Sequence, residues 1–102
     1  MLSIAICDDE GWSAEQITNF VREYLHHHPE LSGQIHTFQR GQELLCQAEE
    51  AGGFDLYLLD IIMPGLDGIQ TGRQLRQLGD GGEIIYLTTS PDYAVGSYSV
   101  PA

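Results

Sequence analysis

Short apolar runs alternate with segments of helical spacing along the chain, and this alternation restricts the possible folds more than any other feature. Four runs have the length and composition of buried strands, at residues 2–7, 34–38, 54–59 and 83–87. Helical spacing follows each of them, at about 12–26, 42–50, 67–78 and 91–98. Strands that alternate with helices predict a parallel sheet covered on both faces, because parallel strands need right-handed crossover connections.

Individual residues mark where several of these elements begin and end. Ser13 is expected to cap the first helix, and Asp67 is expected to cap the third. Pro29 ends the first helix, and the pair Gly52-Gly53 ends the second. The predicted buried stripe of the first helix comprises Ile17, Phe20, Val21, Tyr24 and Leu25.

The length and charge of the chain limit its partners. Its 102 residues suit one domain and are too few for two. Fifteen acidic residues stand against four arginines and no lysine, a formal net charge of −11. Nucleic acid and anionic lipid both need a basic face, so direct binding to either is not expected. Neither a secretion signal nor an apolar run of ~20 residues is found, so we expect a cytoplasmic protein.

Carboxylates and hydroxyls stand at the ends of three predicted strands. Asp8 and Asp9 follow the first strand, and Asp60 follows the third. Thr88 and Thr89 follow the fourth. Ligands bind beyond the carboxyl ends of the strands in an open parallel sheet, and clustered carboxylates favour a cation there. Oxygen ligands without His or Cys predict a hard ion, Mg²⁺ or Mn²⁺, beside which a carboxylate can attack phosphorus to give an aspartyl phosphate.

Three segments, at residues 4–10, 58–68 and 84–89, resemble the motifs of the receiver domain of two-component response regulators. This resemblance covers essentially the whole chain. It implies a flavodoxin-like α/β fold, a doubly wound parallel sheet of order 2-1-3-4 that lacks the family's fifth strand and fifth helix. Residues 1–102 are then one receiver domain, truncated at its C-terminal end. Residues 88–95 and Cys7 further resemble regulators that carry a LytTR DNA-binding domain.

The resemblance also implies a role for each residue of the site. Asp60 is the expected phosphoacceptor. The expected metal ligands are Asp8, Asp9, Asp60 and the backbone carbonyl of Ile62. Thr88 is the expected switch hydroxyl that binds a phosphoryl oxygen, and Thr89 occupies the small-residue position behind it. Family members also place a lysine after a fifth strand, and this chain contains no lysine.

The function implied is Mg²⁺-dependent acceptance of a phosphoryl group on Asp60 from a sensor histidine kinase, a regulatory role and not an enzyme's. The output is expected to be transcription regulation by a DNA-binding domain outside this chain. Two alternatives stay open: a degenerate receiver that acts only through protein contacts, and an Mg²⁺ phosphohydrolase with an aspartyl nucleophile. Such hydrolases typically carry a second acid two positions after the nucleophile, where this chain has Ile62. Flavin binding is disfavoured by the acidic loop after the first strand.

Other features are interpreted as structural. Without a fifth strand, residues 83–88 become an apolar sheet edge, so we expect homo-oligomers through this strand or the neighbouring face. The run His26-His27-His28 is interpreted as a helix end, where cationic His complements the dipole. Cys7 is expected to be a small buried residue, and with Cys46 it forms no metal or redox motif. Trp12 is expected at the rim of the site or packed on the first helix.

Overall fold

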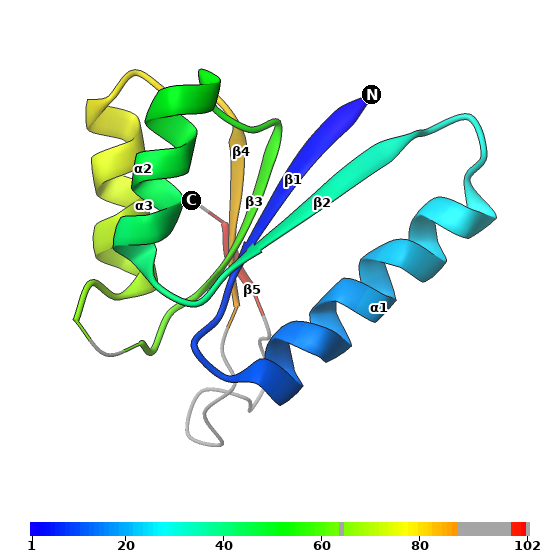
Figure 1. Cartoon of the computed structure of the whole chain (residues 1–102), viewed down its shortest axis with the longest axis horizontal. Coiled ribbons are helices and arrows are strands. Elements are labelled where there is room, and N and C mark those ends of the chain that lie inside the picture. The colour runs from blue at the N-terminus through cyan, green and yellow to red at the C-terminus, as the bar shows by residue number, and fades with distance from the viewer. Residues whose placement is uncertain (64, 88–98, 102) are drawn as a thin grey trace.

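The computed structural model describes residues 1–63, 65–87 and 99–101 (Figure 1). Its strands are β1 (Leu2–Cys7), β2 (Gly33–Phe38), β3 (Leu56–Asp60), β4 (Glu83–Leu87) and β5 (Ser99–Pro101). Its helices are α1 (Gly11–His27), α2 (Gly41–Ala51) and α3 (Gly68–Gln77). From β1 to β4, strands and helices alternate as the sequence predicts. The predicted helix at 91–98 lies outside the described residues.

The strands form one sheet of order β2-β1-β3-β4-β5. β1 to β4 run parallel, which confirms the predicted α/β fold and the order 2-1-3-4. β5 pairs antiparallel with β4, opposite Ile85–Leu87. This strand is not predicted from the sequence, because three residues that include a proline carry little strand signal; proline is tolerated at a sheet edge. β4 is therefore not the bare edge that the sequence predicts.

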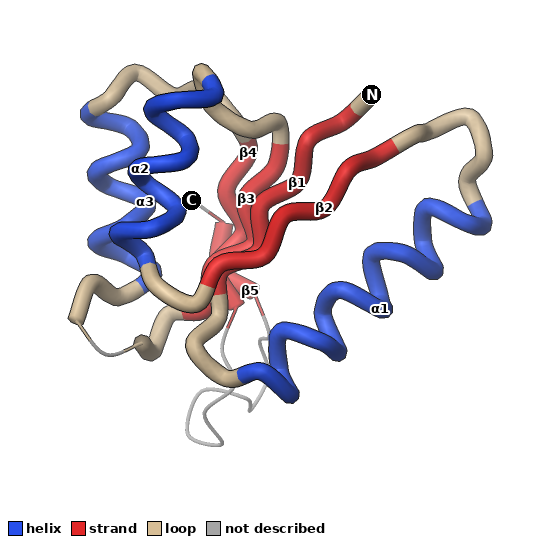
Figure 2. The backbone as a smooth tube through the Cα atoms, viewed as in Figure 1, coloured by secondary structure: helices blue, strands red, loops and turns tan. Residues whose placement is uncertain are grey.

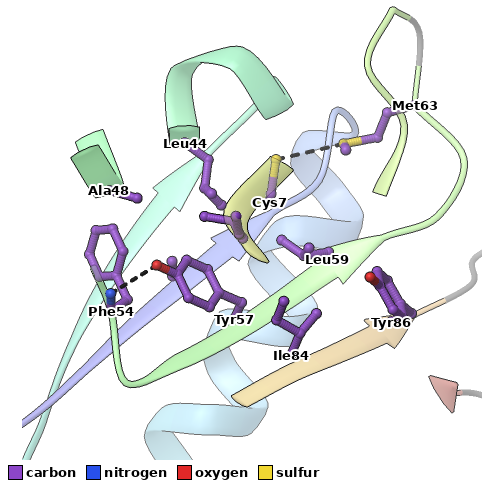
Figure 3. Packing of buried hydrophobic residues seen from close by; sticks show 11 residues of the cluster. Cys7, Leu44, Ala48, Phe54, Tyr57, Leu59, Met63, Ile84 and Tyr86 are labelled. Carbon is purple, nitrogen blue, oxygen red and sulfur yellow. Dashed lines mark hydrogen bonds between the residues drawn. The ribbon is translucent and has the colours of Figure 1, made fainter. Parts of the chain in front are cut away.

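Helices cover both faces of the sheet, but unequally. α2 and α3 lie side by side on one face, whereas α1 lies on the other and contacts β1 and β2 (Figure 2). Successive strand residues point to opposite faces. Cys7 and Leu59 therefore pack toward α2 and α3 (Figure 3), and Ile6 and Leu58 pack toward α1. This two-sided burial explains why the strands are continuous apolar runs.

The helix ends confirm two of the predicted signals and correct a third. The Asp67 side chain accepts the Gln70 N–H at 2.8 Å and the Gln70 side chain accepts the Asp67 N–H at 3.0 Å, so α3 begins with a capping box. Gly52 ends α2 with a φ of 80°. The prediction for Ser13 is wrong: Glu10 precedes α1 without a side-chain cap, and Ser13 is buried in the first turn.

The predicted buried stripe of α1 is only partly buried. Val21 is buried, but Phe20 and Tyr24 are 71% and 50% exposed. The physical reason is that α1 packs mainly over β1 and β2, so nothing in the described part of the chain covers Phe20 and Tyr24. No helix in the described residues is both long enough and apolar enough to cross a membrane.

A buried tyrosine fastens the amino-terminal end of β3 to the turn before β4. The Tyr57 hydroxyl donates a hydrogen bond to the Asp80 carboxylate and accepts one from the Phe54 N–H at 2.9 Å (Figure 3). Asp80 in turn accepts the Gly82 N–H at 2.9 Å. Burial and the bond to Asp80 raise the pKa of Tyr57, so its hydroxyl stays a donor. These bonds fix β3 at the end opposite Asp60.

Candidate functional site

The ends of β1 and β3 bring three carboxylates together. Cys7 pairs with Leu59 across these parallel strands, so the next residues, Asp8 and Asp60, stand beside each other. Asp9 follows directly. One carboxylate oxygen from each of the three acidic residues lies within 4.8 Å of the others. The structure thus places together the three side chains that the sequence predicts to share a cation, and the roles assigned to them stay predictions.

Two of these carboxylates are buried, and each has one oxygen without a hydrogen-bond partner among the described residues. Asp8 is 0% exposed and Asp60 is 1% exposed, whereas Asp9 is exposed. Asp8 Oδ1 accepts the Glu10 N–H at 2.9 Å, but Asp8 Oδ2 and Asp60 Oδ1 have no hydrogen-bond partner among the described residues. A buried carboxylate oxygen without a donor or counter-charge is strongly unfavourable. The site is therefore short of positive charge, as expected of a cation site.

The raised pKa of Asp60 also indicates that the site is short of positive charge. Its pKa is raised to about 7, first by burial and then by the negative charge of Asp8; a backbone hydrogen bond from Ile62 lowers it in part, and Asp9 raises it further. A cation among these groups would return Asp60 to its ionised form. Because all the donors are carboxylate oxygens, the residues fit a hard divalent ion such as Mg²⁺.

In the absence of a divalent cation, we expect Asp60 to reduce stability as pH rises. Its folded-state pKa of about 7 exceeds the ordinary 3.8, so between these values the native state binds more protons than the unfolded state. The unfolding free energy then falls as pH rises through that window. Urea denaturation in EDTA at pH 5 and pH 8 measures the effect. Asp60→Asn is the control, because its pH dependence comes from all the other titratable groups. If the unfolding free energy of the wild type fell no more between pH 5 and pH 8 than that of Asp60→Asn, the raised pKa of Asp60 would be contradicted.

The segment between β3 and α3 is fixed close to the carboxylates. The Ile61 N–H donates to the Leu87 carbonyl at 2.8 Å, and the Gly68 N–H donates to the Ile61 carbonyl at 3.1 Å. Met63 is buried, and its sulfur lies 3.7 Å from Cys7 Sγ (Figure 3). The segment that follows Asp60 is thereby tied to both neighbouring strands, β4 through Leu87 and β1 through Cys7.

Gly68 packs against the backbone of the site. A Cβ at this position would lie 2.2 Å from the carbonyl oxygen of Asp60, so the first residue of α3 packs directly on the Asp60 backbone. Only glycine leaves room for this approach. The signal that could have found it is its position immediately after the predicted cap Asp67, eight residues beyond the strand-end carboxylate.

The other residues singled out in the sequence either have a structural role or lie outside the residues that the structure describes. Cys7 is fully buried, and burial together with the charge of Asp8 raises its pKa to about 12, so it is a protonated thiol as expected. Trp12 is 69% exposed at the start of α1, so it does not pack on that helix. Ile62 is half-exposed, and a role for its carbonyl stays a prediction. Thr88 and Thr89 lie outside the described residues.

The three consecutive histidines lie at the C-terminal end of α1, as predicted. His26 and His27 occupy the last turn of α1. The ring of His28 stacks on Tyr24 with centroids 4.2 Å apart, and its Nδ1 lies 3.2 Å from a Glu30 carboxylate oxygen. In the described part of the chain, the cluster at Asp8 is the one group of potential metal ligands.

The fold and this acidic site agree with a family match. Residues 4–99 match the description "Response regulator receiver domain". The chain belongs to this family. Receiver domains are regulatory domains of two-component signalling that interact with sensor histidine kinases. The resemblance to receiver domains stated from the sequence is thereby confirmed.

Two characterised relatives show how this receiver domain compares in sequence. The transcriptional regulatory protein ResD of Bacillus subtilis is 36% identical over 74 residues, covering 72% of this chain and 28% of that protein. The positive alginate biosynthesis regulatory protein of Pseudomonas aeruginosa is 29% identical over 107 residues, covering 99% of this chain and 39% of that protein. The receiver domain described here therefore spans less than half the length of either relative.

Solved structures show the same fold. The N-terminal domain of a response regulator/sensory box/GGDEF 3-domain protein from Carboxydothermus hydrogenoformans gives a TM-score of 0.69 at 26% identity, covering 91% of this chain and 69% of that chain. The receiver domain of a histidine kinase from Arabidopsis thaliana, complexed with Mg²⁺ and BeF₃⁻, gives 0.67 at 23% identity, covering 87% and 66%. At this identity the second likeness supports the fold of the receiver domain alone.

Proposed function

We propose that this receiver domain accepts a phosphoryl group on Asp60 from a sensor histidine kinase, with Mg²⁺ held by Asp8, Asp9 and Asp60. The observation that carries the proposal is the pair of buried oxygens without partners, Asp8 Oδ2 and Asp60 Oδ1, within one cluster of carboxylates. The backbone carbonyl of Ile62 is proposed as a further ligand. When bound, Mg²⁺ would neutralise charge on the carboxylates and on the incoming phosphoryl group.

The chain's own residues supply the nucleophile and its position. The free Oδ1 of Asp60 can form a bond to phosphorus while the bond from phosphorus to the kinase's histidine nitrogen breaks. β-sheet pairing with Leu87 and the contact with Gly68 hold the Asp60 backbone in place. Holding the attacking oxygen in a fixed position lowers the entropy loss of the transfer step. Thr88, the next residue after Leu87 in sequence, is proposed as the hydroxyl that binds the phosphoryl oxygen, and Thr89 as the family's small-residue position.

We further propose that the phosphorylated domain regulates transcription through a DNA-binding output domain, of LytTR type. Both relatives are named as regulatory proteins, and ResD is named as a transcriptional one. Each relative is more than twice as long as the part that matches. The chain described here has a net charge of −11, with four arginines and no lysine to contact DNA phosphates. Self-association of the chain stays a prediction.

Phosphoryl acceptance is tested with acetyl phosphate as donor. With Mg²⁺ present, intact-mass spectrometry is expected to show the mass of one phosphoryl group added to the wild-type chain, and EDTA is expected to prevent it. Asp60→Asn should show no gain. Asp55→Asn is the matched control, because Asp55 is an exposed carboxylate before the other end of β3 and should not affect the gain. A wild-type chain that gains no mass, or an Asp60→Asn chain that does, would refute the proposal.

A further inference from the structure

A polar groove lies between α1 and the end of β2, beside the carboxylate cluster. Its volume is about 380 Å³, and ligand pockets are typically about 300–1,000 Å³. The residues of α1 that line it recur every three or four positions from Gly11 to Arg22, so one face of the helix forms one wall. Residues 37–39, at the end of β2, form the other wall (Figure 2). The groove is therefore long enough to hold an extended molecule parallel to α1.

The two ends of this groove carry opposite charges. Glu15 and Arg22 both line it and are exposed, and two helical turns separate them, about 10 Å along the axis of α1. Asp8, which precedes α1 in the chain, is buried at the Glu15 end. In the described part of the chain, only histidines pair with carboxylates, so the Arg22 guanidinium has no carboxylate partner there. The groove thus suits a molecule with a cation at one end and an anion at the other.

The wall formed by β2 offers backbone groups as well as side chains. β2 is the outermost strand of the sheet beside β1. The Phe38 carbonyl accepts the Asp8 N–H at 3.0 Å, so the backbone groups of Phe38 face β1. Because successive strand residues direct their N–H and C=O groups to opposite sides, those of Thr37 face the open edge. An extended peptide can pair with such an edge through its own backbone.

We propose that this groove binds a short extended peptide with free ends, whose ammonium lies near Glu15 and Asp8 and whose carboxylate pairs with Arg22. Three extended residues span about 10 Å, which matches the separation of the two charged ends. The side chains of Asn19 and Gln39, which also line the groove, supply donors and acceptors for the peptide's amides. A planar guanidinium binds a carboxylate through two parallel hydrogen bonds, which fixes the direction of the peptide.

Peptide binding would also act on the carboxylate cluster, because Asp8 belongs to both. An ammonium near Asp8 and a divalent cation in the cluster repel each other, so each ligand weakens the binding of the other, and by linkage to the same extent. This consequence rests on the cation site proposed above. The groove itself does not, since its other charged residues, Glu15 and Arg22, lie outside the cluster.

Titration of the ¹⁵N-labelled chain with triglycine in EDTA, followed by NMR, tests the proposal. Amide shifts are expected at residues 11–22 and 37–39 and should saturate with a Kd of about 10 mM or less. Triglycinamide, which lacks the carboxylate, and N-acetyl-triglycine, which lacks the ammonium, should each bind at least about threefold more weakly. Arg22→Gln should weaken triglycine binding to the same extent. Arg73→Gln is the matched control, since Arg73 is an exposed arginine of α3 in the other layer.

Shifts that do not saturate, equal affinity for the three compounds, or equal weakening by Arg22→Gln and Arg73→Gln would each overturn the proposal. Because this titration is made in EDTA, its result does not depend on the cation site. Calorimetric Mg²⁺ titration then tests the direction of the peptide. Saturating triglycine should raise the Kd for Mg²⁺ at least about twofold in the wild type and less in Arg22→Gln. An unchanged Kd in the wild type would contradict an ammonium near Asp8.

Discussion

Replacing Gly68 with alanine is expected to destabilise the domain by roughly 3 kcal/mol, the upper part of the usual range for overpacking. The new Cβ would lie 2.2 Å from the carbonyl oxygen of Asp60, 2.8 Å from its carbonyl carbon and 3.0 Å from the Cα of Ile61. All three are backbone atoms at the end of β3, where Asp60 pairs with Leu87 of β4, so no side-chain rotation can relieve the contact. Such a loss is a large share of the free energy of unfolding of a typical domain, which is about 5–15 kcal/mol.

The same substitution is expected to weaken the cation site, because relief of the clash must move Asp60 or the start of α3. Urea denaturation measures the stability, and Mg²⁺ titration measures the site. Gly81→Ala is the matched control, since a Cβ there meets no atom within 4 Å. If Gly68→Ala were as stable as Gly81→Ala and bound Mg²⁺ equally well, α3 would not position Asp60 as described.

Replacing Asp8 with asparagine is expected to have opposite effects on the metal-free and Mg²⁺-bound protein. Without a cation, removal of the Asp8 charge lowers the raised pKa of Asp60 and should stabilise the domain at pH 8. With Mg²⁺, the wild-type domain gains about 2.7 kcal/mol when the ion is present at 100 times its Kd. Asp8→Asn should lose most of that gain, because the ion loses a charged oxygen ligand.

Thermal and urea denaturation in EDTA and in Mg²⁺ measure both effects with one pair of proteins. Asp55→Asn removes an exposed carboxylate at the other end of β3, where Asp55 Oδ2 accepts the Ser3 N–H at 2.8 Å, and should leave the response to Mg²⁺ unchanged. An Asp8→Asn domain that is less stable in EDTA and still responds to Mg²⁺ as the wild type does would show that the buried carboxylates do not repel each other.

Much of the fold is predictable from the sequence because the strands of a two-sided parallel sheet are continuous apolar runs. β1, β3 and β4 are found in this way, and the capping box at Asp67 marks the start of α3. The clustering of Asp8 with Asp60 follows from the same reasoning, since parallel strands end at a common edge.

Other features depend on tertiary contacts that no local pattern encodes. Helical spacing identifies the apolar face of α1, but not how much of the sheet lies beneath it, so the exposure of Phe20 and Tyr24 is not predictable. The antiparallel pairing of β5 is a long-range contact of only three residues. The approach of Gly68 to Asp60 depends on how α3 sits against the end of β3. Each of these three features depends on packing between different helices and strands, and not on the sequence of a single helix or strand.

The central claim is that Asp8, Asp9 and Asp60 form a single site for one divalent cation. Calorimetric titration with Mg²⁺ at pH 8 tests it most directly, using the wild type, Asp8→Asn, Asp9→Asn, Asp60→Asn and the control Asp55→Asn. We predict one ion bound per wild-type chain, weaker binding in each of the three site variants, and wild-type affinity in Asp55→Asn. Absence of binding to the wild type, or equal affinity in all five proteins, would contradict the account.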